Sequence, residues 1–394
     1  MKVLALGDLH FGRDYAYGRP DAETGINSRL LDYEKTLANI ITYAIDEKIE
    51  LFIFLGDIFE TRNPAPQQVV VFYRQLKRLS DAGITTYVIV GNHDFLKSRK
   101  ITSSLDPLKE IQLPKVHIFT DIELKTFTDS NDEKVNVLLV PYRNRQCYDK
   151  ETNNDALAEL ANEISVAKSK AHIGSPILAC LHMMFEGTIP SDAGEMGLSE
   201  LVLPFDMFDG IDVSIAGHIH RSSILKKDPV IIYSGSMECN DFSEREHKKC
   251  FLIYDTKKSG ADVITFKPIE TRRFIDFEVD YSANLPPDPN IDIVEQINQQ
   301  NINEAVVRVS IKVPESKVAT IDLTAIRSAL HSAKVSCVSD ISVTPVITKQ
   351  LRNQKINDAP DDISAFKHYI NTQNNIDDGV LKLGLMIMTA EIED

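Results

Sequence analysis

The tetrapeptide Gly91-Asn92-His93-Asp94 decides how this chain is interpreted. It directly follows the apolar run Tyr87-Val88-Ile89-Val90 and places an amide, an imidazole and a carboxylate on three consecutive residues. A single polar cluster of this kind is usually only a turn. Its meaning comes from repetition, because the same pattern of an apolar run followed by polar side chains recurs as far as His220.

Four further clusters share this pattern, and each follows a short hydrophobic run that predicts a strand. In chain order they are Gly7-Asp8-Leu9-His10, Gly56-Asp57, His182 and Gly217-His218-Ile219-His220. In an open α/β sheet, the loops at the carboxyl ends of the strands converge on one crevice. We therefore expect a single site formed by Asp8, His10, Asp57, Asn92, His182, His218 and His220.

The chemistry of these side chains predicts a pair of metal ions. Seven oxygen and nitrogen donors are too many for one closed zinc site, which takes four. They suit two neighbouring ions that share one carboxylate, and Asp57 is the predicted bridge. A donor set without thiolate favours two Mn²⁺, with Mg²⁺ or Fe as alternatives. Two ions about 3.5–4 Å apart serve in-line displacement at phosphorus, so we predict a metal-dependent phosphoester hydrolase.

Two residues of the tetrapeptide are predicted to act in catalysis. His93 lies beside a predicted ligand without needing to bind metal, and it is placed to protonate the departing oxygen. Asp94 either fixes the tautomer of His93 or braces the turn, and the sequence leaves both alternatives open.

A polar loop between residues 11 and 27 supplies candidate substrate contacts. They are Arg13, Tyr15 and Arg19. This loop either binds the phosphate backbone of a nucleic acid or is an ordinary solvent-exposed loop. Isolated histidines such as His117 and His172 are interpreted as ordinary surface or core residues.

Composition sets the class of protein. The 394 residues predict more than one domain, and a hydrophobic content of 43% excludes global disorder. The net charge of −15 argues against a general polyanion-binding surface, so any nucleic-acid contact must be local or depend on bound cations. The five cysteines are scattered, without a CxxC pair, which is typical of a reduced protein. With no signal peptide before Met1-Lys2-Val3 and no long apolar run, we expect a cytoplasmic location.

Periodicity divides the chain into three predicted parts. Alternating strands and helices predict an α/β domain over residues 1–270, with largely parallel pairing at its start and Cys250 to Asp255 as its last strand. Alternating strands near 275–279, 307–313 and 341–347, with helical patterns at 293–297 and 318–330, predict an α+β domain over 271–350. Residues 351–394 form a predicted helical tail whose apolar run, 381–388, packs on the chain itself or on a partner.

The five clusters, in this order, resemble the motifs of the calcineurin-like metallophosphoesterases. Within that superfamily, the chain is most similar to the SbcD-type DNA repair exonucleases. This narrower resemblance rests on Phe11-Gly12-Arg13, Tyr233-Ser234-Gly235-Ser236 and Asp241-Phe242-Ser243-Glu244. The superfamily motifs cover residues 1–240, and one departure stands out, because Glu60 occupies a position where some family members carry a second histidine.

The resemblance implies a metallophosphoesterase β-sandwich flanked by helices, with a small α+β capping domain and a C-terminal helical tail. It assigns one ion to Asp8, His10, Asp57 and His220, and the other to Asp57, Asn92, His182 and His218. It makes His93 catalytic in Mn²⁺-dependent cleavage of DNA phosphodiesters, as a 3′→5′ exonuclease and single-strand endonuclease. The expected partners are DNA, a second copy in a homodimer, and an SbcC-type coiled-coil ATPase bound by the tail.

Two other functions are compatible with the same motifs. One is a phosphatase that acts on phosphoproteins or small phosphoesters, which needs neither the second domain nor the apolar tail. The other is a metal-free scaffold, which has no need to keep all seven ligand-type side chains. We therefore expect the nuclease function.

Overall fold

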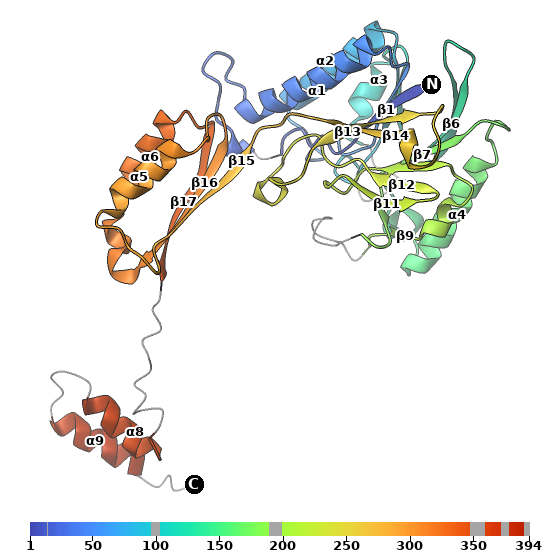
Figure 1. The fold of residues 1–394 in the computed structure, drawn as a ribbon. Coiled ribbons are helices and arrows are strands. Elements are labelled where there is room, and N and C mark those ends of the chain that lie inside the picture. Colours follow the sequence, from blue (N-terminus) through green and yellow to red (C-terminus); the bar gives the residue numbers. More distant parts are fainter. Residues whose placement is uncertain (14, 96–102, 189–198, 347–358, 372–377, 390–394) are drawn as a thin grey trace. The chain divides into compact units, whose positions relative to one another are not determined.

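The computed structural model describes residues 1–13, 15–95, 103–188, 199–346, 359–371 and 378–389 (Figure 1). The chain divides into two compact units. Unit 1 contains Met1–Asp276, Gln300–Arg308 and Leu330–Asp340, and unit 2 contains Phe277–Gln299, Val309–Ala329 and Ile341–Asp394. The predicted three-part division, with boundaries at 270 and 350, stays a prediction.

The first sheet of unit 1 has six strands in the order β14-β13-β1-β2-β3-β4. Its strands are β1 (Lys2–Leu6), β2 (Leu51–Phe54), β3 (Thr85–Ile89), β4 (Val116–Phe119), β13 (Cys250–Asp255) and β14 (Ile264–Pro268). Strands β1 to β4 pair in parallel, which confirms the predicted start of the domain. The prediction that Cys250 to Asp255 ends the domain is wrong, because β14 follows and pairs antiparallel with β13. Strand β14 is short and half-buried, so its periodicity is weak, but it covers the edge of β13.

The second sheet has the order β11-β12-β10-β7-β6-β5. Its strands are β5 (Glu123–Thr128), β6 (Lys134–Val140), β7 (Ile177–Leu181), β10 (Val213–Ala216), β11 (Ser223–Lys227) and β12 (Val230–Tyr233). The four inner strands are parallel, and β5 and β11 are antiparallel edges. Buried side chains of both sheets share one apolar core, for example Val3 and Ile53 with Val137 and Ile215. Unit 1 is therefore a β-sandwich.

Helices cover the outer faces of this sandwich. They are α1 (Ser28–Asp46), α2 (Pro66–Asp81), α3 (Asp106–Glu110) and α4 (Asn153–Lys168). The periodicity predicts both α1 and α2, and the structure shows that they lie side by side (Figure 1). The side chain of Asn27 caps α1 by accepting a hydrogen bond from the backbone N–H of Arg29, 2.9 Å away. Leu30, Leu37 and Ile41 then bury one face of α1 against the first sheet.

Short elements complete unit 1. Strands β8 (Met184–Phe185) and β9 (Val202–Leu203) form a small parallel pair. Short 3₁₀ helices occur at Tyr15–Tyr17, Arg145–Tyr148, Phe205–Phe208, Phe242–Glu244 and Gly260–Val263. The loop expected at residues 185–193 lies partly outside the described residues.

A three-stranded sheet in the order β15-β16-β17 contributes residues to both units. The strands are β15 (Phe274–Asp280), β16 (Val306–Pro314) and β17 (Cys337–Val346), and α5 (Pro289–Gln299) and α6 (Leu323–Ser332) cover one face of the sheet (Figure 1). The helical pattern predicted over 318–330 is divided. A 3₁₀ helix ends at Thr320, and Asp322 then caps α6 by accepting hydrogen bonds from the N–H groups of Thr324 and Ala325. Strand β17 begins before the predicted residue 341, and residue 347 lies outside the described residues.

Two helices near the C-terminus, α8 (Asp362–Asn371) and α9 (Asp378–Thr389), agree with the predicted helical tail. The rest of that tail lies outside the described residues. The two helices pack closely, because a Cβ atom on Gly384 would lie only 2.3 Å from the ring of Phe366. On the same hairpin, Leu383 and Ile387 are largely exposed. Within the described part of the chain, no helix is both long and apolar enough to cross a membrane.

Candidate metal centre

The loops that follow five parallel strands carry the predicted ligands. Asp8 and His10 follow β1, Asp57 follows β2, Asn92 follows β3, His182 follows β7, and His218 and His220 follow β10. These strands belong to both sheets of the sandwich, and the structure brings all seven side chains into two adjoining clusters. The crevice at the carboxyl ends of the strands is where such folds place their sites.

The first cluster contains Asp8, His10 and His220, whose donor atoms all lie within 4.8 Å of one another. The Nε2 atoms of His10 and His220 face each other at 2.9 Å. The Oδ2 atom of Asp8 is buried and has no hydrogen-bond partner among the described residues. A buried oxygen without a partner and two facing imidazole nitrogens form a donor set that suits a divalent cation. The residues present therefore fit a metal.

The second cluster contains Asp57, His182 and His218, with Asn92 at its centre. The amide Oδ1 of Asn92 lies 2.9 Å from Nε2 of His182 and 2.9 Å from Nδ1 of His218. The carboxylate of Asp57 approaches Nε2 of His182 to 3.3 Å. This mixture of oxygen and imidazole donors also fits a divalent cation.

Asp57 lies between the two clusters. Its Oδ2 atom is 3.6 Å from Nε2 of His10 and 3.3 Å from Nε2 of His182. Its Oδ1 atom accepts a hydrogen bond of 2.9 Å from the backbone N–H of His93, which fixes the carboxylate plane. One carboxylate oxygen therefore faces donor atoms of both clusters, as a bridging ligand would.

Burial and mutual charge set the protonation of the centre. Burial raises the pKa of Asp8 to about 6. It lowers the pKa of His10 to about 4 and that of His218 to about 3, so both rings are neutral near pH 7. Burial opposes charge on both Asp57 and His182, but their mutual attraction outweighs it. This attraction holds the pKa of Asp57 well below its usual value. The negative charges of Asp57 and Asp8 raise the pKa of His182 to about 9. A neutral imidazole is the form that binds a metal, so His10 and His218 are already in the ligating form.

The backbone at the centre is strained in a way that points to function. Asp8, His10, Asp57 and His218 have φ angles of 51°, 50°, 48° and 85°, in the left-handed region that few residues other than glycine adopt. Such strain persists only where the surrounding structure enforces it, and it gathers at functional sites. Gly91 packs directly on one of these residues, because a Cβ atom there would lie 2.1 Å from Oδ1 of Asp57. A side chain at position 91 would therefore displace the shared carboxylate.

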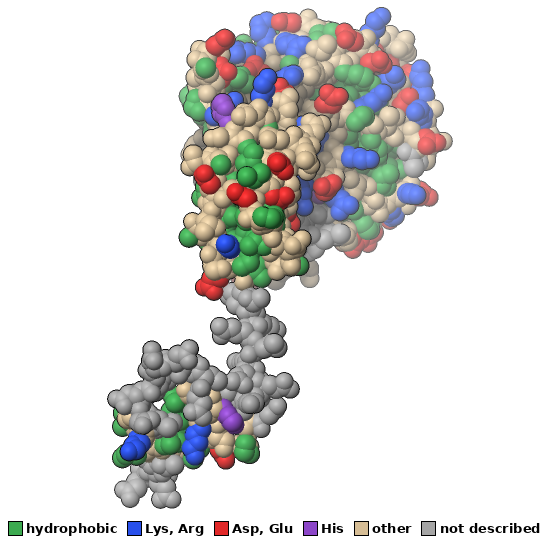
Figure 2. All heavy atoms as spheres, turned by 60° about the vertical axis from the view of Figure 1, so that its left-hand side comes forward, with side chains coloured by type: hydrophobic (Ala, Val, Ile, Leu, Met, Phe, Trp, Pro, Cys, Tyr) green, Lys and Arg blue, Asp and Glu red, His purple; other side chains and the backbone are tan. Residues whose placement is uncertain are grey.

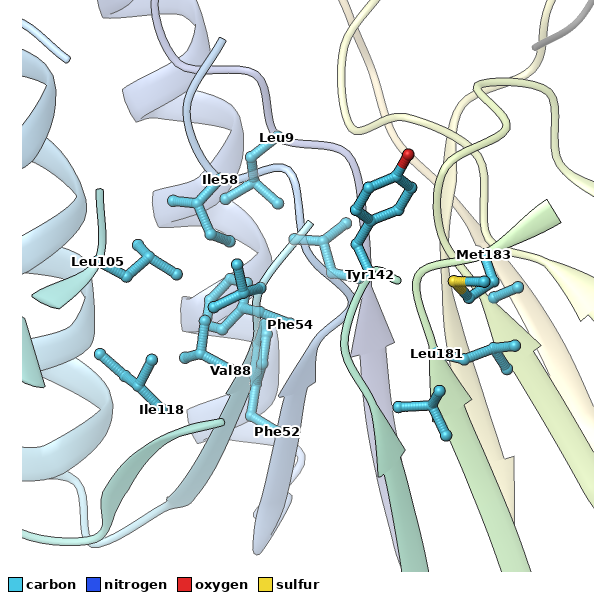
Figure 3. Packing of buried hydrophobic residues seen from close by; sticks show 14 of the residues in the cluster. Leu9, Phe52, Phe54, Ile58, Val88, Leu105, Ile118, Tyr142, Leu181 and Met183 are labelled. Carbon is cyan, nitrogen blue, oxygen red and sulfur yellow. The ribbon is translucent and has the colours of Figure 1, made fainter. Parts of the chain in front are cut away.

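Apolar residues between the ligands anchor the loops in the core. Leu9 and Ile58 are fully buried beside Asp8 and Asp57. They lie with Leu105 near the first sheet, while Tyr142, Leu181 and Met183 lie near the second (Figure 3). Alternating a buried apolar residue with a metal-type donor fixes the direction in which each donor points.

Each imidazole of the two clusters has a partner on the nitrogen that faces away from the proposed metal. Sequence reasoning missed these neighbours. Three of them form hydrogen bonds: Glu60 Oε2 behind His10 (2.8 Å), the Leu55 carbonyl behind His182 (2.7 Å) and Glu244 Oε1 behind His220 (2.7 Å). The fourth, Glu200 Oε1, lies 3.4 Å from Nε2 of His218 without a hydrogen bond. Such partners fix the tautomer and orientation of a ligating histidine. The sequence had singled out two of the four, Glu244 as part of a resembling segment and Glu60 as a departure from the family pattern, but neither for its contact with a histidine.

His93 lies at the edge of the centre, beside an open pocket. Its Nδ1 donates a hydrogen bond of 2.7 Å to the backbone carbonyl of Glu60, and its side chain is 33% exposed. Burial opposes charge on this ring, but Asp57 and the Glu60 carbonyl outweigh it and raise the pKa of His93. The pocket holds about 330 Å³ and is lined by Glu60, Thr61, Arg62, Asn63, Asn92 and His93. A raised pKa favours the protonated form of the ring, which is the form that can donate a proton at the pocket wall.

Asp94 is fully buried, and its carboxylate accepts hydrogen bonds from three backbone N–H groups. These belong to Ile58 (3.1 Å), Phe59 (3.0 Å) and Gly91 (3.1 Å). Burial raises the pKa of Asp94 to about 6. Of the two alternatives that the sequence left open, these contacts favour the bracing of the turn. A catalytic role for Asp94 stays a prediction.

The three predicted substrate contacts lie in different surroundings. The guanidinium of Arg13 lies 3.7 Å from the carboxylate of Glu60 and 3.7 Å from that of Asp241, which places it beside the first cluster. The hydroxyl of Tyr15 accepts a hydrogen bond from the side chain of Gln68 on α2, 2.6 Å away. Arg19 is exposed, and its backbone N–H donates to Ser28 Oγ at the start of α1. A substrate contact at any of the three stays a prediction.

The chain belongs to the calcineurin-like phosphoesterase family, whose model matches residues 1–222. This is the superfamily that the five motifs indicated. Divalent metals are typical of these enzymes, and the two clusters supply the ligand groups.

The proteins similar in sequence to this chain include one that is named as a nuclease. An uncharacterised metallophosphoesterase, YhaO of Bacillus subtilis, is 26% identical over 267 residues, 65% of this chain and 58% of the relative. The DNA double-strand break repair protein Mre11 of Sulfolobus acidocaldarius is 25% identical over 300 residues, 75% of this chain and 68% of the relative. One component of the nuclease SbcCD of Bacillus subtilis is 26% identical over 276 residues, covering 65% of this chain and 66% of the relative. The chain thus spans about three fifths to two thirds of the length of these relatives.

Among solved structures, a dimetal phosphatase from Danio rerio is similar with a TM-score of 0.43 and 11% identity. The match covers 68% of this chain and 96% of that one. This likeness is too weak to bear on the substrate.

Proposed function

We propose that this protein is a Mn²⁺-dependent DNA nuclease, with 3′→5′ exonuclease and single-strand endonuclease activity, that acts in DNA break processing and recombination. The observation that carries the proposal is the position of Asp57 Oδ2 between two ligand clusters, with His93 beside them at the wall of an open pocket. This geometry suits the cleavage of a phosphodiester.

The residues have distinct proposed roles. Asp8, His10, Asp57 and His220 hold one ion, and Asp57, Asn92, His182 and His218 hold the other. Two divalent cations bound here supply an activated water and neutralise charge on the phosphoryl oxygens. As the water attacks phosphorus and the bond to the leaving oxygen breaks, His93 gives its proton to that oxygen. The Glu60 carbonyl holds the Nδ1 side of the His93 ring, so Nε2 is left for this transfer.

DNA as the substrate rests on the relatives and on local charge. Mre11 is named for DNA double-strand break repair and SbcCD for nuclease activity. Arg13 and Arg62 lie close to the centre although the chain carries a net charge of −15. We propose that the region 271–350 is a DNA-capping domain. Helix α5 of this region carries the acidic residues Asp292 and Glu295 and no basic residue, and acidic side chains are prominent on this surface (Figure 2). Because DNA is negatively charged, it would contact another face of the domain.

An assay with end-labelled DNA tests the function. Purified protein with Mn²⁺ is expected to shorten linear duplex DNA from its 3′ end and to cut single-stranded circles. Mg²⁺ is expected to support less activity, because ions of different softness and geometry suit this mixed donor set unequally. The measurement is the length of 5′-labelled and 3′-labelled products over time, and Asp8→Ala serves as the inactive control.

The outcomes separate the alternatives. Activity only on phosphopeptides or small phosphomonoesters would replace the nuclease by a phosphatase on the same centre. A protein that binds no Mn²⁺ and hydrolyses none of these substrates would be a scaffold.

The α8–α9 hairpin is the proposed binding site for an SbcC-type coiled-coil ATPase, and a homodimer is the proposed state of the nuclease. Leu383 and Ile387 are 59% and 68% exposed, while Phe366 packs against Gly384 inside the hairpin. Apolar side chains on an exposed helix face mark interaction sites. Hydrophobic side chains are visible on the surface of the hairpin (Figure 2).

We predict that deleting residues 355–394 removes ATPase binding and leaves basal nuclease activity intact. The double variant Leu383→Glu, Ile387→Glu is expected to weaken binding at least about tenfold, because it places charge in an apolar contact. Size-exclusion chromatography and titration with the partner measure the loss. Ile291→Glu is a matched control, since Ile291 is 58% exposed on α5. Loss of nuclease activity on deletion would mean that the hairpin belongs to the catalytic core.

A further inference from the structure

Glu60 contacts two residues that the proposed function assigns to different tasks. Its carboxylate Oε2 accepts a hydrogen bond of 2.8 Å from Nδ1 of His10, a proposed metal ligand. Its backbone carbonyl accepts one of 2.7 Å from Nδ1 of His93, the proposed proton donor. The rings of His10 and His93 meet edge to face, 4.9 Å apart.

The position of Glu60 is fixed by its own backbone. The N–H of Glu60 donates to the Phe11 carbonyl at 3.1 Å, and the N–H of Phe11 donates to the Ile58 carbonyl at 2.9 Å. The segment that carries Glu60 therefore runs directly beside the loop that carries His10. The guanidinium of Arg13 lies 3.7 Å from the same carboxylate, on which it and His10 are the neighbouring donors.

We propose that Glu60 is a positioning residue with two roles. Its side-chain carboxylate selects the tautomer of His10 that can bind a metal, and its backbone carbonyl orients the ring of His93. Because Nδ1 of His10 keeps its proton and donates a hydrogen bond to the carboxylate, Nε2 carries the lone pair that faces His220 and Asp57. Because a carbonyl holds His93, that second role does not depend on which side chain stands at position 60. The inference rests on the metal centre of the proposed function, but not on DNA as its substrate.

The two roles are separable by substitution. In Glu60→Ala, His10 loses its acceptor, so the affinity of the metal-free protein for Mn²⁺ is expected to fall by about 10- to 100-fold. His93 keeps the carbonyl of residue 60, so turnover at saturating Mn²⁺ is expected to return to within a few-fold of wild type both on bis(p-nitrophenyl) phosphate, which reports the metal centre, and on DNA, whose leaving oxygen also needs the proton of His93. In Glu60→Gln, the amide oxygen still accepts the hydrogen bond, so affinity stays closer to wild type than to Glu60→Ala.

Isothermal titration with Mn²⁺ measures affinity, and steady-state rates across a range of Mn²⁺ concentrations measure rescue. Glu159→Ala is the matched control, because it removes a partly exposed carboxylate on α4 that pairs with Lys150, and it is expected to leave Mn²⁺ affinity unchanged. Thermal unfolding shows whether Glu60→Ala is folded, and Glu60→Gln carries the comparison if it is not.

Two results would overturn the inference. One is wild-type Mn²⁺ affinity in both Glu60 variants. The other is a loss of turnover in Glu60→Ala that excess Mn²⁺ does not restore, which would place Glu60 on the substrate instead. A protein that shows the expected Mn²⁺ behaviour but cleaves no DNA would refute the proposed substrate and leave this inference standing.

Discussion

Asp57→Asn is expected to lower kcat/KM for DNA cleavage by about 10³-fold or more at saturating Mn²⁺. The amide keeps the shape of the side chain but removes the negative charge that both ligand clusters face. Metal-based stabilisation of charge at phosphorus contributes several kcal/mol, and each 1.36 kcal/mol corresponds to about tenfold in rate. Steady-state cleavage rates, with the Mn²⁺ content of the purified protein, measure the effect.

A matched control for this variant is Asp121→Asn. Asp121 is an acidic residue whose side chain is 71% exposed and which pairs with Arg143 rather than with the centre. That control is expected to keep wild-type activity and two bound Mn²⁺ per chain. If Asp57→Asn also keeps two Mn²⁺ and turns over within tenfold of wild type, Asp57 is not the shared ligand.

His93→Gln is expected to lower the turnover of DNA by about 10²- to 10⁴-fold, the usual contribution of a general acid. Its effect should depend on the leaving group. A p-nitrophenyl ester releases a stable anion that needs no proton, so the same variant should lose far less activity on bis(p-nitrophenyl) phosphate. Steady-state rates on the two substrates, together with Mn²⁺ affinity by titration, measure this contrast.

His117→Gln provides the comparison, because His117 is a partly exposed histidine on β4, away from the ligand loops. It should affect neither substrate. Equal losses on DNA and on the p-nitrophenyl ester in His93→Gln would exclude a proton-donor role, and weakened Mn²⁺ binding would make His93 part of the metal site.

Local sequence was sufficient to predict the ligand loops. A short buried strand followed by Asp, Asn or His is visible in the sequence, and parallel strands bring their carboxyl ends to one edge. For this reason Asp8 and His220 were predicted to meet although more than 200 residues separate them along the chain. The helices and the parallel start of the first sheet followed from the same periodicity, whereas the sandwich was expected only from the resemblance that the motifs carry.

The partners behind the histidines were not predictable in this way. Glu60 and Glu200 lie in loops, and Glu244 ends a short 3₁₀ helix. Their tasks depend on which imidazole nitrogen the tertiary structure turns toward them. The Leu55 carbonyl behind His182 has no side-chain signature at all. Strand β14 was missed because its half-buried residues alternate over too short a run. The break before α6 was missed because the capping carboxylate of Asp322 interrupts an otherwise continuous apolar pattern.

The carboxylate of Asp94 joins the loop after β2 to the loop after β3 through backbone amides, and the hydroxyl of Ser104 lies 3.5 Å from the same carboxylate. Backbone amides are present whatever side chains the loops carry. The loops of a homologue could therefore replace these two without loss of the hydrogen bonds to Asp94, provided that residues 57–60 and 91–94 are transplanted together. A graft that changes the backbone path of one loop alone would move these N–H groups away and leave the buried carboxylate of Asp94 without its donors. Engineering of new specificity on this scaffold should therefore treat the two loops as one cassette and vary the pocket rim at residues 61–63 instead.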